Sequence, residues 1–112
     1  GEVERDDEGE VLLEVSLFDL IGALSRILEN LKGEQVEEIV RDETTVKDKI
    51  EFILNMLLKE EKVNFSSLFG NVRLKTEAIV TFLALLELVK IQKVRIGKAS
   101  EFGEIFLHRH GK

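Results

Sequence analysis

The chain has 112 residues, of which 44% are hydrophobic and 34% charged, and it contains no cysteine. This composition predicts one small globular domain with an appendage, and it excludes a disulfide framework, a thiolate metal site and a wholly disordered chain. The net charge of −6 is misleading as an average, because the acidity lies at the N-terminus and the rest of the chain is neutral, which makes this neutral body a poor match for a phosphate backbone. No signal peptide or membrane-spanning run is evident, which favours a cytoplasmic protein, and an initial Gly in place of Met suggests a cut fragment.

The net acidity is concentrated at the N-terminus, because the acids and bases of the rest of the chain balance. The acids there are Glu2, Glu4, Asp6, Asp7, Glu8, Glu10 and Glu14, against the single base Arg5. A segment of this composition is more typical of a linker than of a packed element. We therefore predict that residues 1–15 are the acidic end of a linker.

Ser16 begins the first predicted helix, and Asp19 follows it at the spacing of a capping box. Gly33 is a suitable stop, so we predict an amphipathic helix over residues 16–33. Apolar residues recur along it at helical spacing and form one stripe: Leu17, Leu20, Ile21, Leu24, Ile27, Leu28 and Leu31. This domain or a partner could cover the stripe, and the sequence leaves both possibilities open.

Residues 34–43 are polar and acidic, and they are predicted to be a linker or a short strand near Ile39. Thr45 and Asp48 then repeat the capping spacing and open a second helix over about Val46–Lys59. Its expected core stripe is Val46, Ile50, Ile53, Leu54 and Leu57. An extended step at residues 63–65 and one helical turn at residues 66–69 follow.

The segment Thr76–Ile91 predicts a long helix, with Thr76 as its N-cap. Helical spacing places one apolar set on a face that we expect in the core: Ile79, Phe82, Leu83, Leu86 and Val89. A second apolar set falls on nearly the opposite face: Val80, Ala84, Leu88 and Ile91. A helix that is apolar all round needs cover on both sides, and this one is too short to span a bilayer. We therefore predict that a partner protein covers the second face, and the sequence leaves open which of the two faces is core and which is contact.

Two alternating segments, residues 93–96 and 104–109, predict a closing hairpin with its turn at residues 97–103. The order of helix, short helix, long helix and hairpin is that of a winged helix-turn-helix, which we assign to residues 44–112. The predicted fold class is mainly α with a small β hairpin, a winged helix-turn-helix preceded by an amphipathic helix.

The sequence shows no evident arrangement of residues for catalysis or for binding a cofactor. No glycine-rich phosphate loop, nucleophile–base pair or carboxylate dyad stands out, so we expect no enzyme, cofactor or catalytic residue. His108 and His110 would supply only half of a zinc site, and no metal site is predicted. The outward face of the long helix offers apolar side chains and glutamates, which do not suit base readout. The more basic hairpin nevertheless leaves a DNA-binding transcriptional regulator as the alternative function.

One family shares these features. Residues 81–90, TFLALLELVK, resemble the signature helix in the C-terminal domain of bacterial segregation and condensation protein A, the kleisin subunit of the bacterial condensin. Residues 63–69, VNFSSLF, resemble the step before that helix, and residues 102–105, FGEI, resemble the final wing strand. Residues 15–24, VSLFDLIGAL, are similar to the helix that precedes the winged helix in these proteins.

The resemblance implies a non-enzymatic adaptor of chromosome condensation and segregation, cytoplasmic and associated with the nucleoid. In the family, the winged helix docks on the ATPase head of a structural-maintenance-of-chromosomes (SMC) subunit, so that the kleisin bridges the two heads and closes a ring around DNA. A dimer of segregation and condensation protein B wraps the central segment. DNA is then bound only indirectly, through the complex.

We expect two sets of contact residues. The candidate SMC-head contact is Val80, Thr81, Ala84, Leu85, Leu88 and Phe106. The candidate contact for the second partner is Phe18, Leu20, Leu24, Ile27 and Leu31. The expectation for the head contact is that a buried aliphatic side chain contributes about 1.5–3 kcal/mol when it is desolvated.

Overall fold

The computed structural model describes residues 3–5, 11–13, 15–31, 45–98 and 103–110. Its C-terminal part is a winged helix built from α3 (Val46–Lys59), β3 (Lys62–Asn64), the 3-10 helix η1 (Phe65–Phe69), α4 (Lys75–Lys90), β4 (Val94–Lys98) and β5 (Ile105–Arg109). The three strands form an antiparallel sheet in which β5 lies between β3 and β4. Helices and a small sheet in this order confirm the predicted fold class.

Both predicted capping boxes are present. In α1 (Leu17–Glu29), the Ser16 hydroxyl accepts a hydrogen bond from the backbone N–H of Asp19, and the Asp19 carboxylate accepts one from the N–H of Ser16. Thr45 and Asp48 make the same reciprocal pair at the start of α3. Each pair satisfies two N–H groups that have no partner within the helix, so both helices start where the sequence predicts. α1 ends at Glu29, whereas Gly33 lies outside the described residues.

The N-terminal end of α4 differs from the prediction. The helix begins at Lys75 with Leu74 as its N-cap, and Ala78 N–H bonds to the Leu74 carbonyl, so the assignment of Thr76 as N-cap is wrong. The C-terminal end closes as a Schellman motif. Lys93 N–H bonds to the Leu88 carbonyl at 2.9 Å, and residue 92 between them has φ 65°. The left-handed position is occupied by a glutamine, although glycine is the usual residue there.

The core lies between α3, α4, η1 and the inner face of the wing. Its fully buried large side chains come from each of these elements: Ile53, Leu57, Leu68, Leu85, Leu88, Val94 and Leu107. The Phe65 ring packs at 5.1 Å from Phe69 and edge-on at 6.4 Å from Phe82, measured between centroids. These contacts fix η1 against α4.

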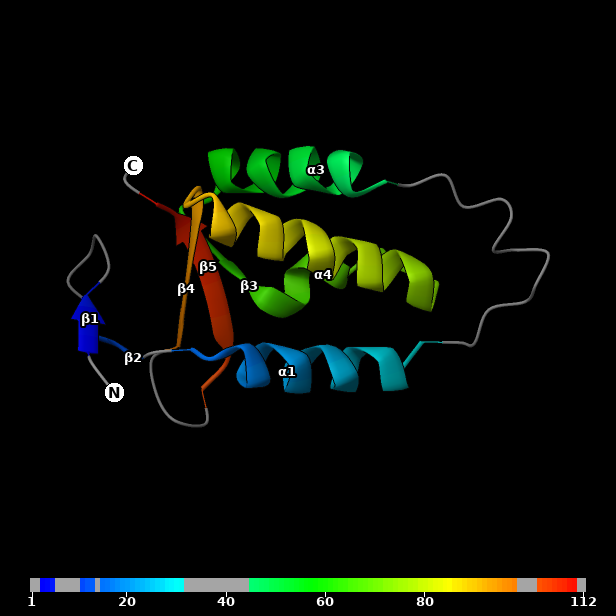
Figure 1. Cartoon of the computed structure of the whole chain (residues 1–112), viewed down its shortest axis with the longest axis horizontal. Coiled ribbons are helices and arrows are strands. Elements are labelled where there is room, and N and C mark those ends of the chain that lie inside the picture. The colour runs from blue at the N-terminus through cyan, green and yellow to red at the C-terminus, as the bar shows by residue number, and fades with distance from the viewer. Residues whose placement is uncertain (1–2, 6–10, 14, 32–44, 99–102, 111–112) are drawn as a thin grey trace.

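The inner face of α1 packs on the winged helix. α4 lies between α3 and α1 (Figure 1). Leu20 and Leu24 of α1 are buried in the same cluster as the core of the winged helix. The inner part of the α1 stripe is therefore covered by this chain, which resolves the alternative that the sequence left open.

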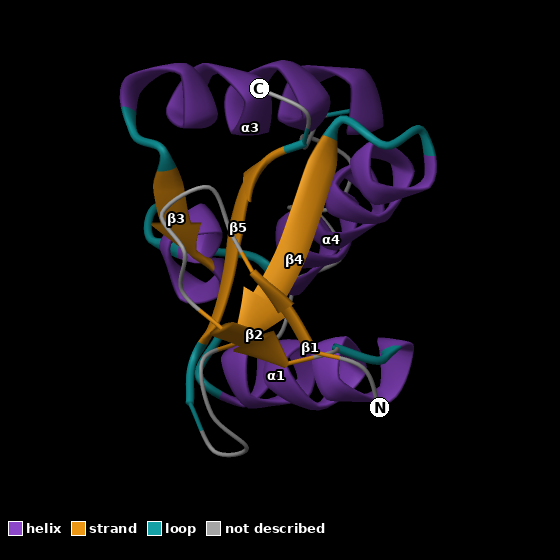
Figure 2. Cartoon of the chain, turned by 90° about the vertical axis from the view of Figure 1, so that its left-hand side faces the viewer, coloured by secondary structure: helices purple, strands orange, loops and turns teal. Residues whose placement is uncertain are grey.

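Two short strands precede α1. β1 (Val3–Arg5) pairs antiparallel with β2 (Val11–Leu13), and β2 joins β4 through Leu13 and Lys98, so the sheet order is β1-β2-β4-β5-β3. β1 lies on the side of β4 and β5 that faces away from α3 and α4 (Figures 1 and 2). Within these two segments the expected linker end is wrong, because tertiary pairing with β4 overrides the polar composition. Residues 34–43 lie outside the described residues, and the division into domains stays a prediction.

Among the described residues, no helix is long and apolar enough to cross a bilayer.

Candidate protein-binding surface

The structure reverses most of the face assignment made for α4. Five of the six residues predicted to contact the SMC head are buried inside this chain: Thr81, Ala84, Leu85, Leu88 and Phe106. Val80 is half-buried. Side chains that are already shielded by their own domain cannot form a docking surface, so this set of contact residues is corrected here.

Small side chains explain why that face points inward. Ala78, Thr81 and Ala84 are each 0% exposed, and they let α4 approach the neighbouring elements closely. The Thr81 hydroxyl donates a hydrogen bond to the Glu77 carbonyl at 2.9 Å, so its burial leaves no unsatisfied donor. These small residues were visible in the sequence and could have identified the inward face of α4, which hydrophobic periodicity alone did not.

The opposite face of α4 carries apolar side chains into solvent. Ile79 is 42% exposed and Leu83 is 46% exposed, although both were expected in the core. Leu86, one turn further on, is half-buried. We call Ile79 and Leu83 the outer α4 surface. Of the set expected in the core, Phe82 is buried and Val89 is half-buried. Because the described core closes without these exposed side chains, they remain available to a partner.

α1 has its own exposed apolar face. Leu17 is 53%, Phe18 is 83% and Ile21 is 43% exposed. We call these three residues the outer α1 surface. Of the candidate second-partner contacts, only Phe18 is on it. Leu20 and Leu24 are buried, so these two are corrected as contact residues, whereas Ile27 and Leu31 are half-buried and stay a prediction.

Phe106 and His108, on the outer side of the wing sheet, are also buried. The ammonium of Lys62 lies 4.4 Å from the centroid of the Phe106 ring, which accounts for part of the burial of Phe106. His108 is 5% exposed, and its Nε2 atom has no hydrogen-bond partner among the residues that the structure describes. Among the described residues no group of three or more His, Cys, Asp or Glu side chains could hold a metal ion.

One basic residue of the wing, Lys98, forms an ion pair within the chain. Its Nζ lies 3.5 Å from Oδ2 of Asp19 on α1. The Ser16 backbone N–H is the largest influence that lowers the pKa of Asp19, burial opposes this shift, and the charge of Lys98 lowers the pKa further. The pKa of Asp19 therefore lies below its usual value, and the carboxylate ties the start of α1 to the end of β4.

Chemically, the exposed apolar surfaces can exclude water against another protein, and they do not suit a nucleic acid. The outer α4 surface is followed by the exposed Glu87, which repels phosphate. On this helix, which is the one that a DNA-binding winged helix inserts into the major groove, the geometry favours a protein partner.

The chain is similar in sequence to several known proteins. Segregation and condensation protein A of Lactococcus lactis subsp. cremoris (strain SK11) is 41% identical over 108 residues, which cover 92% of this chain and 44% of that protein. The protein of the same name from Caldanaerobacter subterraneus subsp. tengcongensis is 36% identical over 103 residues, covering 91% of this chain and 42% of that protein. The one from Bacillus velezensis is 34% identical over 98 residues, covering 85% and 39%. The chain thus spans less than half the length of these relatives.

The family profile described as "Segregation and condensation protein ScpA" matches residues 2–109, and this range includes every described helix and strand. The winged helix, α1 and the strands that precede it all fall within this match. The chain therefore belongs to the segregation and condensation protein ScpA family.

Proposed function

We propose that this chain is the C-terminal part of a kleisin, a non-enzymatic subunit of a bacterial SMC condensin, and that its winged helix docks on the ATPase head of an SMC subunit. In this role it bridges the two heads and helps to close a ring around DNA during chromosome condensation and segregation. Nucleotide is bound by the partner, and DNA is held by the whole complex. The complex works in the cytoplasm at the nucleoid.

One observation carries the choice of docking surface. Ile79 and Leu83 on α4 stay 42% and 46% exposed although the helix is packed by α3 on one side and α1 on the other. Exposed aliphatic side chains on a rigid helix are suitable anchors, because binding removes them from water at little cost in ordering. Family membership supports the proposal, since the relatives are named as segregation and condensation proteins.

The outer α1 surface supports a second contact. Phe18 is 83% exposed on a helix whose inner face is already packed, so a partner can cover it without unfolding the domain. We assign this surface to a dimer of segregation and condensation protein B. The two surfaces belong to different helices, so substitutions can separate one contact from the other.

Calorimetric titration of a purified SMC head with the 112-residue chain tests the head contact. Leu83→Glu places a charge on the outer α4 surface and is expected to weaken binding about 30-fold or more, the effect of losing a hot-spot residue. Leu58→Glu is the matched control, because Leu58 is 67% exposed on α3 and undergoes the same chemical change. Equal binding by both variants would reject the outer α4 surface, and no binding by the unaltered chain would reject the proposed function.

A further inference from the structure

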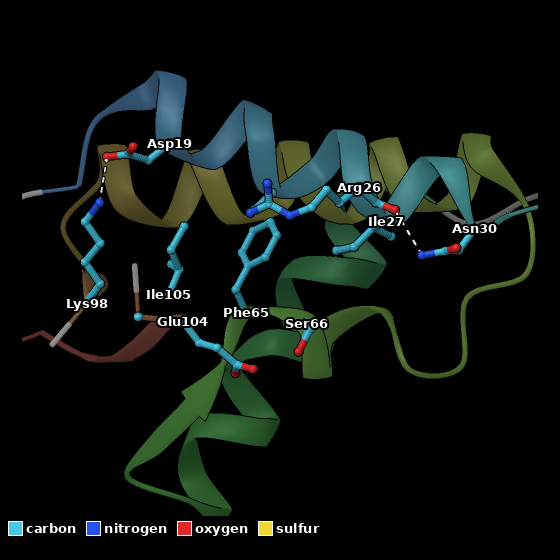
Figure 3. Close-up of a pocket in the computed structure, with 11 residues that line it drawn as sticks. Asp19, Arg26, Ile27, Asn30, Phe65, Ser66, Lys98, Glu104 and Ile105 are labelled. Atoms are coloured by element: carbon cyan, nitrogen blue, oxygen red, sulfur yellow. Dashed lines mark hydrogen bonds and ion pairs between the residues drawn. The ribbon is translucent and has the colours of Figure 1, made fainter. Parts of the chain in front are cut away.

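A groove separates α1 from η1 and the wing, away from the outer α4 and outer α1 surfaces. Its volume is about 420 Å³. It is lined by residues from α1 and the turn after it, from η1, and from the ends of β4 and β5: Asp19, Ala23, Arg26, Ile27, Asn30, Phe65, Ser66, Lys98, Gly103, Glu104 and Ile105. Figure 3 shows the side chains of Phe65 and Ile105 pointing toward α1 from below it. We call this groove the α1–wing groove.

Several of the side chains that form the walls of this groove are held by packing contacts. Phe65 is 3% exposed and is held by its ring contacts with Phe69 and Phe82. α1 is fixed by its buried leucines and by the Asp19–Lys98 ion pair, which closes one end of the groove (Figure 3). Side chains held in this way lose little conformational entropy when the groove takes up a ligand.

Two opposite charges in the groove are not paired. The guanidinium of Arg26 and the carboxylate of Glu104 are both exposed, and neither has a hydrogen bond or ion pair to another side chain within the described ranges. They come from different walls, α1 and the residue before β5, with the Phe65 ring between them (Figure 3). Ile27 and Ile105 add half-buried apolar surface beside that ring.

This arrangement restricts the ligand. A nucleic acid is disfavoured because Asp19 and Glu104 face the groove. A purely apolar ligand would leave the charges of Arg26 and Glu104 desolvated and unpaired. An extended peptide can instead present an acidic side chain, an apolar side chain and a basic side chain within one short stretch.

We propose that the α1–wing groove binds an extended peptide segment of a partner protein, in which an acidic side chain pairs with Arg26, a basic side chain pairs with Glu104, and an apolar side chain lies over Phe65. This contact is independent of docking through the outer α4 surface. It would be a third protein contact of the domain, after the outer α4 and outer α1 surfaces, and it would recognise a peptide sequence rather than a folded surface.

Nuclear magnetic resonance titration of the ¹⁵N-labelled 112-residue chain tests the proposal. The probes are three capped hexapeptides that share an Ala-X-Leu-Leu-X-Ala frame and carry Glu and Lys, two Lys, or two Glu at the X positions. The peptide with Glu and Lys is expected to shift the amide signals of Ala23 and Ile105. It is also expected to bind about two- to fivefold more tightly than either of the others, the effect of one exposed ion pair.

Charge reversal makes the test specific. Arg26→Glu is expected to switch the preference to the two-Lys peptide, and Glu104→Lys to the two-Glu peptide. Glu29→Lys, an exposed α1 position that does not line the groove, is the matched control and should keep the original preference. If no peptide shifts the groove signals, or if the control switches preference as Arg26→Glu does, the proposal is wrong.

Discussion

Lys49 of α3 donates a hydrogen bond from its Nζ to Oε2 of Glu77 on α4 across 3.1 Å. The two side chains are only 12% and 23% exposed, so water screens the pair less than it screens a surface salt bridge. The Lys49 ammonium also lies 5.0 Å from the centroid of the Phe52 ring. This contact joins the first turn of α4 to α3.

A double-mutant cycle with Lys49→Met and Glu77→Gln is therefore expected to give a coupling free energy of about 1 kcal/mol. Urea unfolding followed by circular dichroism supplies the four stabilities. The coupling should shrink as salt is added, since part of it is electrostatic. A coupling that is indistinguishable from zero at low salt would show that the two side chains do not hold the helices together.

The two faces of α4 should respond differently to the same chemical change. Leu88 is 1% exposed, so Leu88→Glu buries an unpaired charge and is expected to destabilise the fold by about 4 kcal/mol or more. Leu83 is 46% exposed, so Leu83→Glu is expected to change the free energy of unfolding by about 0.5 kcal/mol or less. Urea midpoints of the two variants measure these changes in stability. The reverse order of stability would mean that the core of α4 lies on the other face.

The turn after α4 contains backbone strain that a substitution can remove. Gln92 has φ 65°, a conformation in which a Cβ atom crowds the following carbonyl. Gln92→Gly is expected to raise the free energy of unfolding by about 0.5–1 kcal/mol, because glycine adopts this conformation without the steric cost. Gln92→Ala keeps the Cβ atom and is the matched control, expected to bring no such gain. Thermal melts of the three proteins compare them, and a stabilisation by alanine equal to that by glycine would contradict the assignment of strain.

Asp19 gives the stability a specific dependence on pH. Its pKa is lowered from the usual value of 3.8 chiefly by the backbone N–H of Ser16, and further by Lys98. A carboxyl whose pKa is depressed in the folded state stabilises that state fully above its unfolded pKa. The contribution is lost as the pH falls through the folded pKa.

Asp19→Asn should therefore be less stable than the unaltered chain near neutral pH, and the difference should shrink as the pH falls below 3.8 and vanish once it is below the folded pKa. Urea midpoints measured across that range test this. Glu51→Gln is a suitable control, because Glu51 is exposed on α3 with no side-chain partner among the described residues. A stability difference that persists unchanged into acid would mean that Asp19 acts through shape rather than charge.

Local chemistry explains why much of the fold could be predicted. The capping boxes at Ser16 and Thr45 place two helix starts, because a side chain three residues away satisfies the free N–H groups. Alternation along residues 94–98 and 105–109 places the wing strands. These signals act over a few residues, so they do not depend on what the rest of the chain does.

The candidate site was harder to predict, because α4 is apolar on every side. Periodicity assigns a core face only when the opposite face is polar, and here Ile79 and Leu83 compete with Leu85 and Leu88. The pairing of residues 3–5 and 11–13 with the sheet was likewise missed, since it depends on β4, far away in the sequence.

The sequence by itself determined that this protein is a winged helix preceded by an amphipathic helix, through caps, glycines and alternating strands. Only the tertiary structure decided which face of α4 is buried and that α1 packs on this domain. The physical reason is that close packing selects the face with small side chains, Ala78, Thr81 and Ala84, for contact with neighbouring elements. It thereby leaves the larger Ile79 and Leu83 exposed to solvent, where a partner can reach them.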